Sequence, residues 1–116
     1  MTLPDAMRET WVDVVALAAL TPGRGVAALV GGRQVAVFLV ADGELFAVDN
    51  LDPFSGAHVM SRGIVGDRAG VPKVASPMYK QSFDLRTGRC LDDDTVALTT
   101  YPVRVTDAGQ VQVALP

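Results

Sequence analysis

The stretch GVAALVGGRQVAVFLVADGELFAV, residues 25–48, carries most of the strand signals that decide the fold. Gly31 and Gly32 stand between two apolar runs rich in β-branched residues, which is typical of a tight hairpin because both central positions of its turn need positive φ. A second turn of the same kind is expected at residues 41–43. The three strands of the resulting antiparallel meander are predicted at residues 25–30, 34–40 and 45–48.

Strand signals continue on both sides of this meander. Residues 11–15 favour a first strand, followed by one helical turn at residues 16–20 that ends before Pro22. Near the C-terminus, residues 101–105 and 111–115 alternate apolar and polar side chains, which predicts a hairpin with one buried face. Strands therefore dominate the chain outside its middle.

The middle of the chain has a different character. Residues 50–70 hold one proline and four glycines between short apolar pieces, so we expect a loop-dominated segment. Short strands are expected at residues 71–75 and 83–85. The acidic run at residues 92–94 lacks the alternate spacing of a calcium loop and is interpreted as a solvated turn. A meander, a loop-rich middle and a closing hairpin predict an all-β sandwich or small barrel.

Length and composition limit the possible functions. The 116 residues fit one domain, residues 1–116. A net charge of -3 without a basic run argues against a nucleic-acid surface, because phosphate neutralisation needs clustered Lys and Arg. The single Cys90 and single His58 exclude an internal disulfide and a four-ligand Cys/His metal site. A partly buried Cys90 and a surface His58 are expected rather than a nucleophile pair, and no catalytic motif is found.

The sequence also gives an expectation about where the chain works. Residues 1–10 lack the basic-then-apolar pattern of a signal peptide, and the apolar run at residues 14–20 is too short to span a bilayer. The unpaired Cys90 fits a reducing compartment. We therefore expect a cytoplasmic protein that has no membrane partner.

Two segments of the middle region resemble the cluster-binding loops of Rieske ferredoxins. Residues 50–63, NLDPFSGAHVMSRG, are similar to the first loop, which reads Asn-x-Cys-Pro-His in that family. Residues 75–88, ASPMYKQSFDLRTG, are similar to the second loop, which reads Cys-Pro-x-His-Gly-x-x-Phe-Asp-x-x-Thr-Gly. The positions that fall into register with the family are Pro53, Pro77, Phe83, Asp84, Thr87 and Gly88.

Every ligand position of these loops is substituted. Asp52 and Ser76 stand where the resemblance places the cysteines, and Phe54 and Tyr79 stand where it places the histidines. A Rieske centre needs two thiolates and two imidazoles, which argues against an electron carrier because Phe54 has no donor atom and the other three offer only oxygen. Our hypothesis is that the rings of Phe54 and Tyr79 fill the volume of the cluster. The alternative is that they are ordinary core aromatics.

This ligand-free pattern is similar to one family, the small subunit of the cytoplasmic NAD(P)H-dependent assimilatory nitrite reductase. The matching segments are residues 52–57, 61–67, 74–81, 83–91 and 101–105. The resemblance implies a Rieske-like antiparallel fold with a larger sheet unit, residues 10–49 and 91–116, and a tip lobe, residues 50–90. It also implies a partner, a large subunit that carries FAD, a [4Fe–4S] cluster and sirohaem and reduces nitrite to ammonium in nitrate assimilation.

In such a complex the chain would act by contact, as a subunit without a redox centre that docks on and supports the large subunit. Rieske domains usually meet their partners at the tip loops. The charged docking candidates in or beside those loops are Arg62, Asp67, Arg68, Lys80 and Arg86. Lys80 stands where the ligand-bearing family has Gly. Two alternatives stay open: the charges are simply solvated, or the chain is a free-standing protein-binding module on a degenerate Rieske scaffold.

Overall fold

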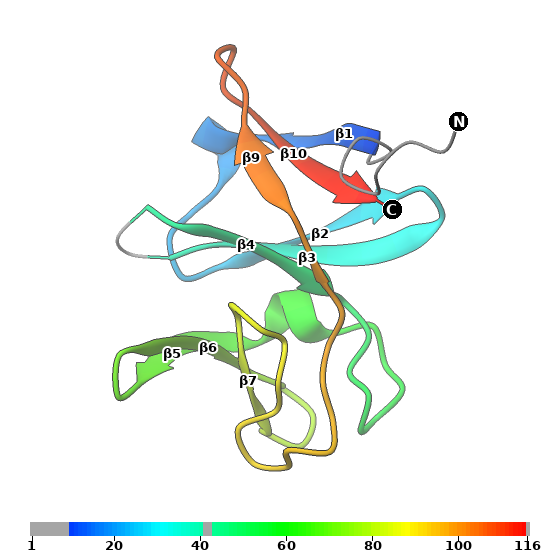
Figure 1. Ribbon diagram of the computed structural model, residues 1–116, viewed down its shortest axis with the longest axis vertical. Helices are drawn as coiled ribbons and strands as arrows, with labels where there is room; N and C mark the ends of the chain where they lie inside the picture. The colour runs from blue at the N-terminus through cyan, green and yellow to red at the C-terminus, as the bar shows by residue number, and fades with distance from the viewer. Residues whose placement is uncertain (1–9, 41–42, 116) are drawn as a thin grey trace, which may run out of the picture.

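The computed structural model describes residues 10–40 and 43–115, which form antiparallel strands in three small sheets (Figure 1). The sheets have the orders β1-β10-β9, β2-β3-β4-β8 and β5-β6-β7. The strands are β1 (Thr10–Ala16), β2 (Gly25–Val30), β3 (Arg33–Leu39), β4 (Leu45–Asp49), β5 (Ile64–Arg68), β6 (Val71–Ala75), β7 (Ser82–Asp84), β8 (Thr100–Tyr101), β9 (Val103–Val105) and β10 (Gln110–Leu115). Two 3-10 turns are η2 (Leu17–Ala19) and η3 (Met60–Arg62). The predicted all-β class is confirmed.

Some expectations concern residues outside these ranges. The N-terminal segment expected to lack a signal pattern falls there for residues 1–9, as do Ala41 and Asp42 of the second predicted turn. Across the described ranges, no helix has the length and apolar character needed to cross a membrane. The division into a sheet unit and a tip lobe at residues 50 and 90 stays a prediction.

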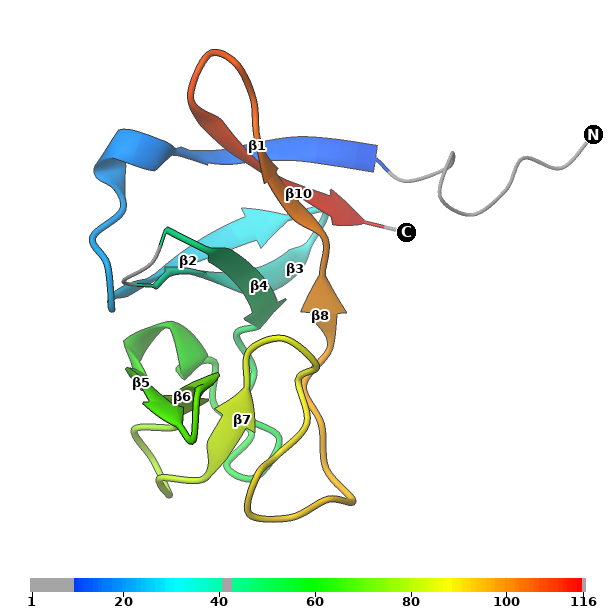
Figure 2. The ribbon, with the colours of Figure 1, turned by 60° about the vertical axis from the view of Figure 1, so that its left-hand side comes forward.

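Strand β3 supplies side chains to both cores of the molecule. Val35 and Val37 pack in a cluster with residues of β10, whereas Ala36 and Phe38 pack in a second cluster with residues of the tip lobe. All four side chains are fully buried. A strand covered on both faces has no polar side, which is why its sequence is a continuous apolar run. Figures 1 and 2 show the resulting layers, with the sheet of β3 between the other two sheets.

The predicted meander and C-terminal hairpin are both present. β2, β3 and β4 are consecutive neighbours, and Gly31 and Gly32 in the first turn have φ of 56° and 81°. β9 and β10 pair as expected, but the single strand expected at residues 101–105 is wrong, since Pro102 divides it. Proline has no N–H to donate to a ladder. β8 before it pairs with β4, and β9 after it pairs with β10 in a different sheet.

The segment of residues 50–70, which was expected to be dominated by loops, contains a strand that the sequence pattern does not predict. β5 pairs with β6 in antiparallel register over all its residues. The turn between the two strands, Ala69-Gly70, has positive φ at both residues, 52° and 85°. The expectation was wrong because Val65 alone of β5 packs on the core, so residues 66–68 show no apolar alternation.

Asn50 joins the sheet of β3 to the first loop of the tip lobe. Its buried side chain donates from Nδ2 to Gln34 Oε1 (3.2 Å) and to the carbonyl of His58 (3.1 Å). Its Oδ1 accepts from the N–H of Ser61 (2.8 Å) in η3. One amide thereby links the side chain of Gln34 on β3 to the backbone at His58 and Ser61, just after the loop of residues 52–57.

Candidate functional site

Two loops of the tip lobe, residues 52–57 and 76–81, repeat one backbone pattern. In each loop a proline follows the first residue, and the fifth residue has positive φ, 75° at Gly56 and 66° at Lys80. The carbonyl of the first residue accepts from the N–H four residues later, and its N–H donates to the carbonyl five residues later. These hydrogen bonds are Gly56 N to Asp52 O (2.8 Å), Asp52 N to Ala57 O (2.8 Å), Lys80 N to Ser76 O (3.0 Å) and Ser76 N to Gln81 O (2.9 Å).

The two loops meet at their first residues, Asp52 and Ser76. The hydroxyl of Ser76 donates to Asp52 Oδ2 at 2.6 Å, and the two residues are 0% and 1% exposed. Asp52 also accepts from the N–H of Phe54 (2.9 Å) and the hydroxyl of Ser55 (3.0 Å). The two positions that carry cysteine in the ligand-bearing relatives are therefore bonded directly to each other.

The hydrogen bonds decide the charge state of the Asp52 carboxyl. Burial disfavours the ionised form and by itself would raise the pKa of Asp52. The donors from Ser76, Phe54 and Ser55 outweigh burial and hold the pKa below its ordinary value of 3.8. Asp52 is therefore an ionised, fully hydrogen-bonded carboxylate at neutral pH.

The residues of this site do not fit a Rieske cluster. Such a cluster takes two thiolates and two imidazoles, while Asp52 and Ser76 offer oxygens that are already engaged with each other. The single Cys90 is buried in the core, and the single His58 lies exposed beside Leu51, as the sequence predicts. Within the ranges that the structure describes, no three His, Cys, Asp or Glu side chains gather in a metal-binding group.

The two aromatic residues at the former histidine positions behave differently. The ring of Phe54 packs on the core at 6.1 Å from the ring of Phe83, with the two planes at 49°, in keeping with the hypothesis that Phe54 fills space between the loops. The hypothesis is wrong for Tyr79, which is 61% exposed. Tyr79 lies within the short 76–81 turn, where its ring extends into solvent and fills no interior volume.

The five docking candidates are all exposed, but the structure does not place them together. Arg68 pairs with Asp92 at 3.5 Å, and Arg86 pairs with Glu44 at 3.6 Å. Asp67 and Arg86 line one cleft between the sheet of β3 and the tip lobe, whereas the other three candidates do not line it. Among the described residues, the side chains of Arg62 and Lys80 have no hydrogen-bond or ion-pair partner.

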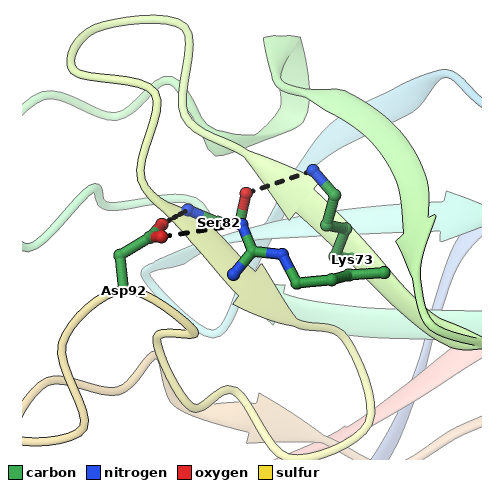
Figure 3. Close-up of polar contacts among 4 residues, drawn as sticks. Lys73, Ser82 and Asp92 are labelled. Atoms are coloured by element: carbon green, nitrogen blue, oxygen red, sulfur yellow. Dashed lines mark hydrogen bonds and ion pairs between the residues drawn. The ribbon is translucent and has the colours of Figure 1, made fainter.

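The acidic run at residues 92–94 does more than face solvent. Figure 3 shows Asp92 and Lys73 on either side of Ser82. Asp92 Oδ2 accepts from the N–H of Ser82 (2.8 Å), and Lys73 Nζ donates to the hydroxyl of Ser82 (3.1 Å). Asp92 is exposed, in keeping with the expected solvated turn, and its carboxylate also caps the outer edge of β7.

Sequence reasoning missed the exposed apolar residues of the tip lobe. Met78 and Tyr79 are adjacent in the second loop and are 50% and 61% exposed, and Ile64 at the start of β5 is 73% exposed. Backbone hydrogen bonds from Ser76 to residues 80 and 81 close this short loop, in which Met78 and Tyr79 are exposed. The available signal was the dipeptide Met-Tyr directly after Ser-Pro in a short loop.

Comparisons with known proteins identify relatives of this chain. A family model described as a Rieske-like [2Fe-2S] domain matches residues 10–114. The nitrite reductase (NADH) small subunit of Salmonella typhimurium is 41% identical over 104 residues, 89% of this chain and 95% of that protein. A segment of the nitrite reductase [NAD(P)H] large subunit of Klebsiella oxytoca is 43% identical over 110 residues, 95% of this chain and 11% of that protein. A crystal structure from Mycobacterium tuberculosis matches with a TM-score of 0.91 and 53% identity over 93% of this chain and 96% of that chain.

The first prediction concerns the pH dependence of stability. Because the folded pKa of Asp52 is lowered, its carboxylate stabilises the fold above the unfolded value near 3.8 and ceases to do so as the pH falls through the folded value. Asp52→Asn is expected to lower the free energy of unfolding by about 2 kcal/mol at pH 7. The difference from wild type should shrink below pH ~4 in urea titrations. Asp94→Asn is the exposed control, and a larger loss for it than for Asp52→Asn would contradict the assignment.

The second prediction separates the two aromatic residues. Phe54→Ala removes a ring that packs on Phe83 and should cost about 1–2 kcal/mol of unfolding free energy. Tyr79→Ala should cost less than about 0.5 kcal/mol, since its ring is mostly exposed. Chemical denaturation of both variants measures the contrast. Equal losses would show that Phe54 has no special packing role.

Proposed function

The chain belongs to the Rieske-like [2Fe-2S] domain family and, within it, to the nitrite reductase small subunits, and from this premise we propose that it is a subunit without a redox centre that docks on the large subunit through its tip lobe. The large subunit would carry the FAD, [4Fe–4S] and sirohaem groups and reduce nitrite to ammonium with NAD(P)H. Nitrate assimilation in the cytoplasm is the setting that we propose for this activity.

The hydrogen bond between Asp52 and Ser76 is the observation that carries the proposal. It closes the two loops on each other with oxygen atoms, at the positions where a Rieske protein holds iron. No ordinary side chain supplies a reversible low-potential electron couple without a cofactor. A contribution of this chain to nitrite reduction therefore has to come through contact with another protein.

The Klebsiella oxytoca relative supports the identity of that partner. In that protein, a segment similar to this chain is part of a polypeptide named as the large subunit. A domain that one organism joins to its large subunit is expected to sit against it where the two are separate chains. We therefore propose the large subunit, rather than an unrelated protein, as the binding partner.

The second loop is the proposed centre of the docking surface. Met78 and Tyr79 present exposed apolar area there, and Lys80 beside them has a side chain without a partner among the described residues. Exposed aromatic and apolar side chains next to a charge are typical of interface hot spots. Lys80 also adopts φ of 66°, a conformation that favours Gly, and such strain often marks functional positions.

Co-expression of the chain with the large subunit of the same organism tests the proposal. We expect the two chains to purify together, and we expect NADH- or NADPH-dependent nitrite consumption to fall when the small chain is omitted. Failure to associate, with unchanged nitrite turnover, would contradict the proposal. Recovery of an unrelated protein in its place would favour the free-standing binding module.

Lys80→Gly gives a sharper prediction because it should raise the stability of the chain and lower its affinity for the large subunit. Gly adopts positive φ without the conformational cost that Lys has there. The free energy of unfolding of the variant should therefore be about 0.5 kcal/mol higher than that of wild type. It should bind the large subunit about fivefold more weakly, since a charged interface contact is lost. Lys80→Ala is the matched control and should weaken binding without the gain in stability. Unchanged affinity of both variants would remove Lys80 from the interface.

A further inference from the structure

A cleft and an open strand edge lie together between the sheet of β3 and the tip lobe. The cleft has a volume of about 430 Å³. Asp67 and the ion pair between Arg86 and Glu44 contribute its charges. Its apolar lining comes from Pro22, Val40, Val65 and Pro72. Residues of β5 form part of this lining, so the backbone of β5 is accessible from the cleft.

The register of β5 decides which of its backbone groups point outward. Asp67 lies opposite Pro72, which has no N–H and whose carbonyl accepts from the N–H of Leu85 (2.9 Å) on the β7 side. Hydrogen-bonded and non-hydrogen-bonded pairs alternate in an antiparallel ladder. The N–H and C=O groups of Asp67 and Val65 therefore point away from β6, and those of Gly66 point toward it. Within the described ranges, the outward groups of Val65 and Asp67 have no backbone partner.

The opposite edge of the same sheet is closed. On β7, the N–H of Ser82 donates to Asp92 Oδ2 (2.8 Å), and the carbonyl of Ser82 accepts from the N–H of Leu91 (2.7 Å). β5 has no such cover among the described residues, since no backbone group pairs with the outward N–H and C=O groups of Val65 and Asp67. Proteins usually protect an exposed edge strand, because its unpaired groups are a template for another chain.

We propose that β5 takes an extended segment of the large subunit as a fourth strand of the β5-β6-β7 sheet. The inference rests on the proposed function, since it adds a backbone contact with the large subunit to the side-chain contacts proposed for the second loop. The added strand pairs its backbone with the outward groups of Val65 and Asp67, as in other cases of strand addition. Every second side chain of that strand faces the cleft, whose apolar lining suits a residue of the size of Val or Leu.

The charge at the edge favours a basic residue in the added strand. Among the described residues, the Asp67 carboxylate accepts one long hydrogen bond, from the N–H of Gly70 at 3.4 Å, and forms no ion pair. A Lys or Arg of the added strand would therefore form an ion pair with the Asp67 carboxylate. The occupant is an extended segment with one apolar side chain in the cleft and one basic side chain at Asp67.

Amide exchange by NMR on the full chain, with and without purified large subunit, tests the backbone pairing directly. In the free chain the amides of Val65 and Asp67 should exchange fast, and those of Gly66 and Arg68, which face β6, should exchange slowly. On binding, the two fast amides should become protected at least about tenfold. A contact made only by side chains would not protect the amides of Val65 and Asp67 selectively.

Two substitutions at one position separate the backbone from the carboxylate. Asp67→Pro removes an outward N–H and keeps the ladder with β6, because proline is tolerated on a free strand edge. Asp67→Ala removes the charge and keeps the N–H. The affinity for the large subunit should fall more than about tenfold for Asp67→Pro and about threefold for Asp67→Ala. Circular dichroism confirms that each variant is folded, and the exchange experiment on wild type stands if one is not.

Each outcome decides between distinct conclusions. If wild type binds but Val65 and Asp67 stay unprotected, or both variants bind alike, strand addition is overturned while the proposed docking stands. If wild type does not bind, docking on the large subunit fails and strand addition fails with it. If the alternating protection appears without the large subunit as the concentration of this chain rises, the occupant is a second copy of the chain and the proposal is overturned.

Discussion

A buried hydrogen bond between a carboxylate and a hydroxyl is the constraint on which the tip lobe depends. Asp52 brings a negative charge out of water, which is costly unless donors surround it, and Ser76, Phe54 and Ser55 supply those donors. The shortest of these hydrogen bonds comes from a loop distant in sequence, so it ties together two loops that are each closed by their own backbone hydrogen bonds. The bond therefore does structurally what a metal centre does in the ligand-bearing relatives, since it fixes the two loops relative to each other.

The sheet of β3 packs on the tip lobe and so connects the paired loops to the rest of the molecule. β3 packs Ala36 and Phe38 against the tip-lobe core and Val35 and Val37 against the other core, so the two halves share one strand. Asn50 then leads from the end of that sheet into the first loop through three side-chain hydrogen bonds. A rigid sheet, a fixed entry and a closed pair of loops leave the second loop well positioned but with its side chains facing out. This arrangement leaves Met78 and Tyr79 of the second loop exposed on the surface.

The sequence predicted the features that depend on local patterns and missed those that depend on a distant partner. Turn glycines and alternation located the meander and the closing hairpin, and the spacing of the two loops identified the Rieske-like site. The bond from Asp52 to Ser76 joins residues whose types alone do not reveal the contact. β5 was missed because its residues do not alternate between apolar and polar side chains. Its pairing with β6 becomes visible only in the structure. The exposure of Tyr79 was missed because the path of its loop is set by the backbone bonds at Ser76.

Several features of the tip lobe that look unfavourable in isolation lie on its surface. Lys80 holds a conformation suited to Gly, Met78 and Tyr79 leave apolar area in water, and β5 leaves backbone groups unpaired within the described residues. The interior shows the opposite, since Asp52 and Ser76 are buried and fully bonded. Gln81 Oε1 is the one buried side-chain polar atom that lacks a hydrogen-bond partner among the described residues, so most of the interior polar side-chain groups are satisfied. The exposed apolar side chains and the unpaired edge of β5 are therefore features that a protein partner would cover.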